Sequence, residues 1–238
     1  MGQPPVDTDF WGALTGADRD RLRALGRMSV FPPGATLCVE GEPATHLFVL
    51  LAGWVKVLSA SRDGSEVMLA LRGHGDVIGE RAGQLEGYRT ATVRAAVRTE
   101  ALAVISERFT AFLAGHSRAD SAFHRAVVRR SHESDDSLRD RAGTSGAQRL
   151  ARRLLYLAGR CGEVTEHGTA ITVPLSQAEL ASWIGVTRAT VTRALQQWRR
   201  RGLISTALGR ITILDPAGLR RVAGLPPPGP PPPGPARG

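Results

Sequence analysis

The segment between residues 175 and 195 combines two helix caps, a turn glycine and a row of basic and hydroxyl side chains. Ser176 with Glu179 three residues later has the spacing of a capping box, and Thr187 can cap a second helix. Gly185, between the two helices, suits a tight turn with a positive φ. Arginine forks match the O6 and N7 acceptors of guanine, while threonine and glutamine can reach bases or phosphates. The pattern therefore predicts a helix-turn-helix whose second helix enters the major groove of DNA.

The residues expected to contact DNA lie at the helix starts, on the outward face of the second helix and in a following wing. The wing is predicted as strands over residues 202–205 and 210–214, with a basic residue at their turn close to a phosphate. The predicted contacts are Ser176, Gln177, Thr187, Arg188, Ala189, Thr190, Thr192, Arg193, Gln196 and Arg210. The alternative is a solvated face on an ordinary helical hairpin, which the caps and the apolar inner face together disfavour.

The distribution of charge supports the same function. Residues 1–146 hold 18 Lys and Arg and 18 Asp and Glu, whereas residues 147–238 hold 13 and 4, so the second part carries the whole net charge of +9. A neutral part joined to a basic part is typical of a sensing or scaffolding module attached to a polyanion binder. From charge alone, an arginine-rich composition without a nucleic-acid partner stays open as an alternative.

A second group of chemically useful residues lies in a β-rich region. Short apolar runs alternate there with turns marked by glycine and proline, which favours a jelly roll or barrel. The runs are residues 47–51, 54–58, 67–71, 92–97 and 101–105. Gly79-Glu80 follows the third run, and Arg89-Thr90-Ala91 precedes the fourth. A buried anionic ester needs an arginine and backbone N–H donors, and a carboxylate suits a ribose hydroxyl.

Helical segments connect these two groups. Apolar spacing predicts a lead-in helix over residues 9–28, and residues 117–142 can form one helix of roughly 39 Å. One row of the long helix falls near a 3.5-residue repeat, as in a dimer seam, although its middle is polar; a simple amphipathic surface helix is the alternative. The row consists of Phe123, Val127, Arg130, Ser134, Leu138 and Arg141.

About residues 8–223 of the chain resemble the Crp/Fnr family of bacterial transcription regulators. The resemblance implies an α+β fold: an effector-sensing β-roll of the cyclic-nucleotide-binding type (8–116), a dimerisation helix (117–142), a hinge (143–146) and a winged helix-turn-helix (147–223). Residues 224–238 form a proline-rich tail that we expect to be disordered. The resemblance further implies a homodimer that binds double-stranded DNA sequence-specifically, with RNA polymerase as a candidate partner. No cofactor is required, and cyclic AMP or another cyclic nucleotide is the implied effector.

The segment Gly79-Glu80 … Arg89-Thr90-Ala91, preceded by Gly75-Asp76-Val77-Ile78, is similar to the phosphate-binding cassette of that family. By resemblance, Arg89 would hold the phosphate, Glu80 would take the ribose hydroxyl, and Ser134 would meet the base. Asp135 would reach the base from the partner subunit. The implied effector site is Gly79, Glu80, Arg89, Thr90, Ala91, Ser134 and Asp135.

The sequence departs from the family pattern at four points. Arg81 stands where cyclic-AMP binders usually carry an aliphatic residue, and the loop from Glu80 to Arg89 is one residue shorter than in the best-known cyclic-AMP receptor. Asp135 replaces a hydroxyl residue. Ala189 replaces an acidic base reader, and alanine can contact a thymine methyl but accepts nothing from cytosine.

Three interpretations of the pocket stay open from the sequence: a cyclic nucleotide, another small ligand, or no ligand, with Glu80 and Arg89 forming only a structural ion pair. The corresponding alternatives in function are a constitutive DNA-binding regulator and a nucleotide-sensing module without DNA binding. If a ligand binds, we expect it to complete the polar middle of the dimer helix and to re-set the hinge. The two recognition helices would then lie about one DNA turn (~34 Å) apart.

Other classes of protein find little support. The six histidines are scattered, without the close pair that a metal-dependent jelly-roll enzyme needs, so we expect neither an enzyme nor a metal site. Cys38 and Cys161 are predicted to be buried and are too few for an iron–sulfur cluster. No apolar run approaches the ~20 residues of a membrane span, and no signal segment opens the chain, so we expect a cytoplasmic protein.

Overall fold

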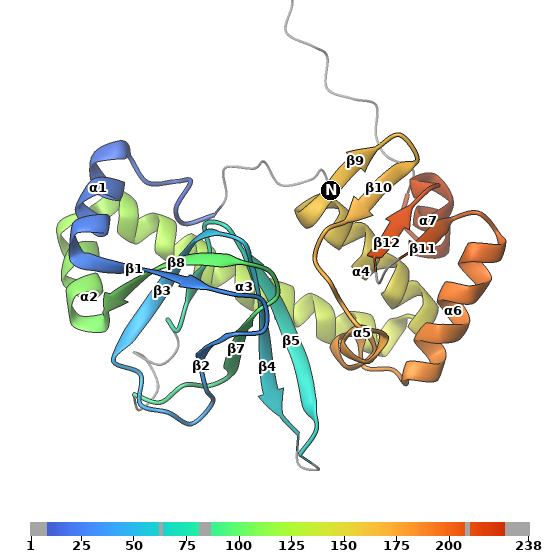
Figure 1. The fold of residues 1–238 in the computed structure, drawn as a ribbon, viewed down its shortest axis with the longest axis horizontal. Coiled ribbons are helices and arrows are strands. Elements are labelled where there is room, and N and C mark those ends of the chain that lie inside the picture. The colour runs from blue at the N-terminus through green and yellow to red at the C-terminus, as the bar shows by residue number, and fades with distance from the viewer. Residues whose placement is uncertain (1–8, 62–63, 81–86, 208–209, 227–238) are drawn as a thin grey trace, which may run out of the picture.

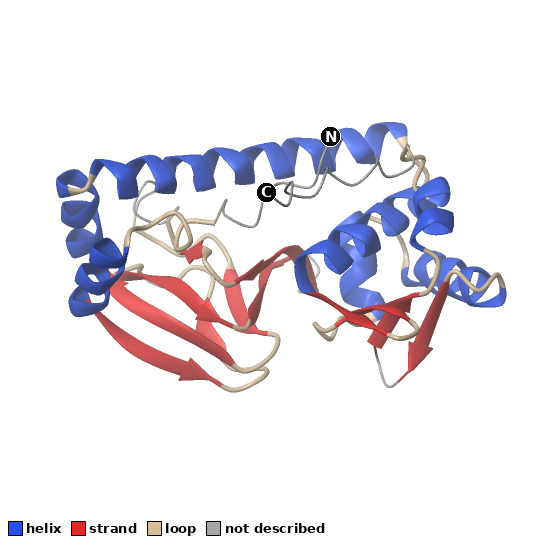
Figure 2. Cartoon of the chain, turned by 90° about the horizontal axis from the view of Figure 1, so that it is seen from above, coloured by secondary structure: helices blue, strands red, loops and turns tan. Residues whose placement is uncertain are grey.

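The computed structural model describes residues 9–61, 64–80, 87–207 and 210–226. The chain forms an N-terminal β-roll and a C-terminal helical unit, and one long helix runs along both (Figure 1 and Figure 2). Three features discussed from the sequence lie outside the described residues: Arg81 with its loop, the wing turn at 208–209, and the proline-rich tail from residue 227 onward.

The first helix, α1 (Gly16–Leu25), is shorter than the predicted lead-in helix over residues 9–28. Thr15 caps it by accepting a hydrogen bond from the Asp18 backbone N–H at 3.1 Å. The helix ends because β1 (Gly26–Phe31) pairs antiparallel with β8 (Thr99–Ile105) along its whole length. The distant partner strand satisfies the backbone groups of residues 26–28, so the prediction of a helix there was wrong.

The β-roll consists of two antiparallel four-stranded sheets. The first has the order β1-β8-β3-β6, with β3 at His46–Ala52 and β6 at Val77–Ile78. The second has the order β2-β7-β4-β5, with bounds Thr36–Cys38, Thr92–Ala95, Trp54–Ala60 and Glu66–Gly73. Buried side chains of both sheets form one cluster between them: Leu37, Cys38, Phe48, Leu50, Val55, Ile78, Val93, Ala95 and Ala101. The five predicted strands and the roll are confirmed.

Two helices follow the roll, α2 (Ser106–Gly115) and the long α3 (Ser117–Gly143). The first half of α3 is anchored through small residues and one ring. Ala119 and Ala122 are buried in one cluster with side chains of the roll, and the centre of the Phe123 ring lies 5.3 Å from that of Phe109 in α2. Within the described ranges, no helix is long and apolar enough to cross a membrane.

The exposed face of α3 differs from the predicted dimer seam. Phe123 packs into the core of the roll and Arg130 turns toward the roll, so neither is available to a partner subunit. The residues that share the exposed face are Ser121, His124, Val128, Ser131, Asp135 and Leu138. Their alternating spacing of three and four is the pattern of a coiled-coil seam. The predicted row was wrong at Phe123 and Arg130 because the protein's own β-roll covers that side of the helix, and of the predicted members Leu138 also belongs to the exposed face. The Arg141 side chain lies outside the described part.

The C-terminal unit surrounds the buried Trp198. Its elements are α4 (Gly146–Cys161), β9 (Gly162–Thr165), β10 (Gly168–Ile171), α5 (Gln177–Ile184), α6 (Arg188–Arg200), β11 (Ile204–Ala207), β12 (Arg210–Ile213) and α7 (Pro216–Val222). The four strands form one sheet of order β11-β12-β10-β9. Gly143 and Gly146 belong to helices, and only Thr144 and Ser145 separate α3 from α4, so the connection is shorter than the predicted hinge over residues 143–146.

The C-terminal unit packs directly on β4 and β5 of the roll. Lys56 Nζ donates to Glu179 Oε1 at 2.6 Å, and the Met68 backbone N–H donates to Ser182 Oγ at 3.1 Å. Met68 and Leu71 of β5 are buried in the same cluster as Trp183 of α5. The two units therefore share an apolar interface that is flanked by polar contacts.

Candidate effector pocket and DNA-binding face

Arg89 is held beneath the surface of the roll with part of its hydrogen-bonding capacity unused. Its backbone N–H donates to Glu42 O at 2.8 Å and its carbonyl accepts from the Gly41 N–H at 2.9 Å. The residue is 5% exposed, yet its Nη1 has no hydrogen-bond partner among the described residues. Gly79 has a φ of 92°, and a side chain there would overlap Arg89 Nη1. The glycine thus leaves room for the guanidinium, which offers an unused cationic donor.

Glu80 is paired with the long helix instead of with Arg89. Its Oε1 accepts from Arg130 Nη1 at 2.5 Å, and the two side chains are 11% and 12% exposed. The interpretation of Glu80 and Arg89 as a structural ion pair was therefore wrong. The heptad spacing placed Arg130 in the dimer seam; an arginine at a seam position was the available signal that this residue serves another purpose.

Asp76 is connected to Glu80 through Arg130. It lies in the run that precedes the cassette, and it was not predicted as a site residue. It is 3% exposed, accepts from the Gly73 backbone N–H at 3.0 Å and lies 3.3 Å from both Arg130 Nη2 and Arg160 Nη2. Burial opposes ionisation of the carboxyl, but the charges of Arg130, Arg72 and Arg160 outweigh it and hold the pKa of Asp76 below its ordinary value.

The remaining predicted effector contacts lie at the surface. Thr90 is exposed and Ala91 is half-buried directly after Arg89. Ser134 and Asp135 are exposed on α3 about one turn beyond Arg130, and Ser134 Oγ donates to Arg130 O at 3.0 Å. Among the described residues, no hydrogen bond joins Ser134 or Asp135 to Glu80 or Arg89. Their contact with a base stays a prediction.

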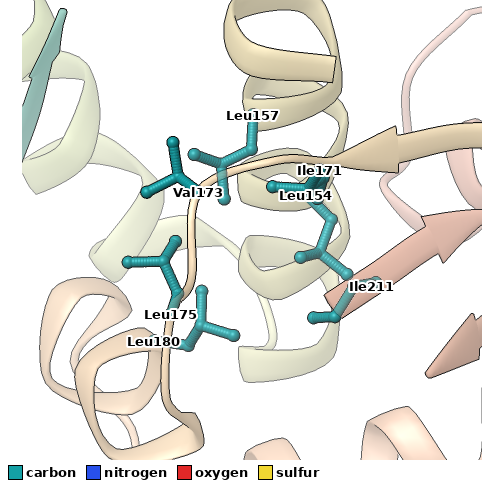
Figure 3. A pocket seen from close by; sticks show the side chains of 7 residues that line it. All are labelled: Leu154, Leu157, Ile171, Val173, Leu175, Leu180 and Ile211. Atoms are coloured by element: carbon teal, nitrogen blue, oxygen red, sulfur yellow. The ribbon is translucent and has the colours of Figure 1, made fainter. Parts of the chain in front are cut away.

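Two other features carry no ligand chemistry. A small gap in the C-terminal unit is lined only by aliphatic side chains, Leu154, Leu157, Ile171, Val173, Leu175, Leu180 and Ile211 (Figure 3). In the part of the chain that the structure describes, no three His, Cys, Asp or Glu side chains gather as a metal ion would require. Both cysteines are buried as predicted, and burial raises the pKa of the Cys161 thiol to about 11.

The helix pair has the local structure predicted from its caps. Ser176 Oγ accepts from the Glu179 N–H at 3.1 Å, and Glu179 Oε2 accepts in return from the Ser176 N–H at 2.7 Å. Gly185 adopts a left-handed conformation with φ of 68° at the end of α5. Thr187 caps α6 by accepting from the Thr190 N–H at 3.2 Å. These contacts fix the angle at which α6 leaves the turn.

The predicted DNA contacts divide into exposed and internally bonded residues. Those exposed on α5, α6 or the wing are Ser176, Thr187, Arg188, Ala189, Arg193, Gln196 and Arg210. Gln177 and Thr192 are half-buried and bonded to each other, with Thr192 Oγ1 donating to Gln177 Oε1 at 2.6 Å. The Thr190 hydroxyl lies 3.0 Å from the Thr187 hydroxyl, and its methyl group faces the start of α4. Direct contact of each residue with DNA stays a prediction.

Comparison with known protein families supports both units. Residues 28–116 match the cyclic nucleotide-binding domain, and residues 148–222 match the Crp-like helix-turn-helix domain. The chain is 30% identical over 215 residues to the "CRP-like cAMP-activated global transcriptional regulator" of Mycobacterium tuberculosis, covering 89% of this chain and 96% of the relative. It is 28% identical over 176 residues to the "cAMP-activated global transcriptional regulator CRP" of Escherichia coli O157:H7, covering 74% and 83%.

The fold leads to the same family. A CRP-family transcriptional regulator from Thermus thermophilus superposes with a TM-score of 0.71 at 29% identity, covering 82% of this chain and 96% of that structure. The β-roll, the long helix and the helix-turn-helix thus occur in the same order and arrangement in a relative with a related sequence. The chain therefore belongs to the CRP family of DNA-binding transcription regulators.

Proposed function

We propose that this regulator acts as a homodimer whose DNA binding is controlled by a cyclic nucleotide bound between Arg89 and Glu80. The observation that carries the proposal is the buried Arg89 guanidinium with a donor that no described residue uses. An unused donor in a buried site costs free energy unless a ligand takes it up. The phosphodiester of a cyclic nucleotide is such a ligand.

The charges of the pocket favour a ligand with a single negative charge. Glu80 and Arg130 neutralise each other, while Arg89 has no ion-pair partner in the described ranges. One phosphodiester would balance the charge of Arg89. The ribose hydroxyl would donate to Glu80, which keeps acceptor capacity beside its bond to Arg130.

Two further observations support this ligand class. The curated relatives include regulators named as cAMP-activated in Mycobacterium tuberculosis and Escherichia coli. In addition, Ser134 and Asp135 lie on α3 about one turn from the arginine that holds Glu80. The Ser134 hydroxyl of one subunit and the partner's Asp135 carboxylate would accept hydrogen bonds from the amino group of a base.

The exposed stripe of α3 supports the homodimer. Val128 and Leu138 are 53% and 63% exposed in the single chain, so each has apolar surface that a second copy could cover. They share a coiled-coil spacing with Ser121, His124, Ser131 and Asp135. Pairing two copies of α3 would cover the stripe and hold two copies of α6 for half-sites about one DNA turn (~34 Å) apart. RNA polymerase is the partner we expect at a promoter.

Calorimetry with cyclic AMP and cyclic GMP tests the pocket. We expect wild-type protein to bind one of them, and Arg89→Ala to lose at least about tenfold in affinity because a charge-assisted hydrogen bond is removed. Arg108→Ala, which removes an exposed arginine of α2, is the control. Unchanged non-specific DNA binding by Arg89→Ala shows that the variant is folded. Equal affinity of wild type and folded Arg89→Ala would contradict the assignment.

His46 offers a second readout of the same pocket. Burial and then the charge of Arg89 hold the pKa of His46 below its ordinary value of 6.5. An anion on Arg89 would cancel the second cause, so an NMR titration should give a higher pKa for His46 with the nucleotide bound. A pKa that does not change on saturation would place the ligand away from Arg89.

A constitutive regulator is the second candidate function. The observation in its favour is that Glu80, Arg130, Asp76 and Arg160 satisfy one another's charges within the chain. It predicts equal DNA affinity with and without either nucleotide. The same protein preparation, titrated with a duplex selected by the wild type from random sequence, distinguishes the two functions.

A further inference from the structure

The side chain of Arg160 crosses from the DNA-binding unit into the wall of the β-roll. It extends from the last turn of α4, and its Nη2 lies 3.3 Å from Asp76 Oδ2. Its guanidinium carbon lies 5.7 Å from the centre of the Trp54 ring, within the range of a cation–π contact. Among the groups described, Arg160 thus has a carboxylate and an aromatic face of the roll as its surroundings.

The carboxylate that receives Arg160 also receives an arginine of the pocket. Asp76 Oδ1 lies 3.3 Å from Arg130 Nη2, and Arg130 Nη1 donates to Glu80 at 2.5 Å. Glu80, Arg130, Asp76 and Arg160 therefore form a continuous row that begins in the pocket, crosses α3 and ends in α4. Asp76 is 3% exposed and Arg130 is 12% exposed, so water screens their interaction little, whereas Arg160 is 30% exposed at the other end of the row.

We propose that this row, which we name the Asp76 relay, transmits occupancy of the pocket to the DNA-binding unit. The proposal rests on the proposed function, since it concerns how the same pocket regulates DNA binding. A ribose hydroxyl that donates to Glu80 competes with Arg130 for the same carboxylate, and this changes what Arg130 can offer to Asp76. Because Arg160 shares that carboxylate, the strength of its contact changes in turn. Arg160 is a positioning residue in this scheme.

The packing of the C-terminal unit allows a movement of Arg160 to reach the DNA-binding face. Leu154 and Leu157 of α4 are fully buried in one cluster with Leu180 of α5 and Trp198 of α6, so these helices form a single packed body. The same body contacts the roll through Lys56 and Glu179. A movement at the end of α4 would therefore change the position of the whole C-terminal unit relative to the roll.

Coupling measurements on the full-length chain test the relay. DNA affinity is measured with and without cyclic AMP for wild type, Arg160→Gln, Arg160→Lys and Arg221→Gln. Arg221 is exposed on α7 in the same unit, so its variant controls for lost charge. We expect Arg160→Gln to bind cyclic AMP. The factor by which cyclic AMP changes its DNA affinity should be at least about fivefold smaller than in wild type. Arg160→Lys should restore part of that change, and Arg221→Gln should retain all of it.

Thermodynamic reciprocity gives a readout that a structural role would not affect. In wild type, the affinity for cyclic AMP must change on DNA binding by the same factor as the affinity for DNA changes on cyclic AMP binding. In Arg160→Gln the affinities for cyclic AMP with and without DNA should converge. If the variant instead weakens DNA binding equally in both states and keeps the coupling, the relay is wrong and Arg160 is only a DNA contact or a folding residue.

A double-mutant cycle tests the relay without any nucleotide. DNA affinities of wild type, Arg130→Gln, Arg160→Gln and the double variant should be non-additive by at least about twofold, because both arginines share Asp76. Additive effects would overturn the relay. A wild type that binds no cyclic nucleotide but shows the non-additive cycle would overturn the proposed effector and leave the relay supported.

Discussion

The effector pocket and the DNA-binding face use arginines in opposite ways. In the pocket, Arg130 is 12% exposed and bound to two carboxylates that come from a different part of the chain. On α6, Arg188 and Arg193 are exposed and have no ion pair within the described residues. Buried, paired arginines hold elements together and couple them, whereas exposed, unpaired arginines stay available for phosphates and base edges. The same residue type thus serves positioning in one region and recognition in the other.

Removing the buried carboxylate should have the largest effect. We expect Asp76→Asn to lower the free energy of unfolding by about 3–5 kcal/mol at pH 7, because Arg130 and Arg160 lose their shared counter-charge. Urea denaturation measures the difference. Asp20→Asn is the control, since Asp20 is 77% exposed in its ion pair with Arg23 and should contribute little. Equal stability of Asp76→Asn and wild type would remove the contrast between the two regions.

The pH dependence of this variant sharpens the same comparison. The pKa of Asp76 in the folded chain lies below its ordinary value of 3.8. Its stabilising contribution is therefore complete above the unfolded pKa and is lost as the pH falls through the folded pKa. The stabilities of wild type and Asp76→Asn should converge at low pH. A constant difference across that range would show that the ionised carboxylate is not the source of the effect.

An exposed arginine of α6 should affect recognition without affecting the pocket. We expect Arg193→Ala to weaken binding to a selected duplex by about 1–3 kcal/mol, through loss of contacts to a base edge, and to leave calorimetric binding of cyclic nucleotide unchanged. Arg118→Ala at the far end of α3 is the control. Equal weakening on random DNA would make Arg193 a phosphate contact, which does not specify sequence.

A smaller effect is expected from the cap of α5. Ser176→Ala removes the acceptor for the Glu179 N–H and should lower the free energy of unfolding of the DNA-binding unit by about 1 kcal/mol. Ser176→Thr, which keeps a hydroxyl, should restore most of it. Thermal unfolding measures both variants. If Ser176→Ala unfolds like wild type, local caps do not determine the stability of this region.

The distance along the sequence between a residue and its partner explains which parts of the site the sequence predicts. Ser176, Gly185 and Thr187 act on neighbours within a few residues, so a short stretch of sequence contains the whole signal. Arg130 acts on Glu80, 50 residues earlier, and the heptad pattern assigned it to a seam. Spacing alone cannot tell which face of a long helix meets its own domain and which meets a partner.

The fold shows the same limit. The strands of the roll and the order of the units follow from local alternation and turns, and they are confirmed. The end of α1 at Leu25 depends on pairing of residues 26–31 with β8, roughly 70 residues away, which helical periodicity does not contain. The contact between Lys56 and Glu179 joins two units that the sequence presents as separate.

That contact has a consequence for protein engineering. Glu179 completes the cap of α5 and also accepts a hydrogen bond from Lys56 of the β-roll. The roll therefore supplies part of what orients α5 of the C-terminal unit. A chimera cut between Thr144 and Ser145 and fused to a foreign sensor would keep the cap and lose the lysine. The C-terminal unit would then have a weaker interface with the foreign domain than with its own β-roll. A working graft needs a sensor with a basic side chain at the position of Lys56 and an apolar strand beside it to replace Met68 and Leu71.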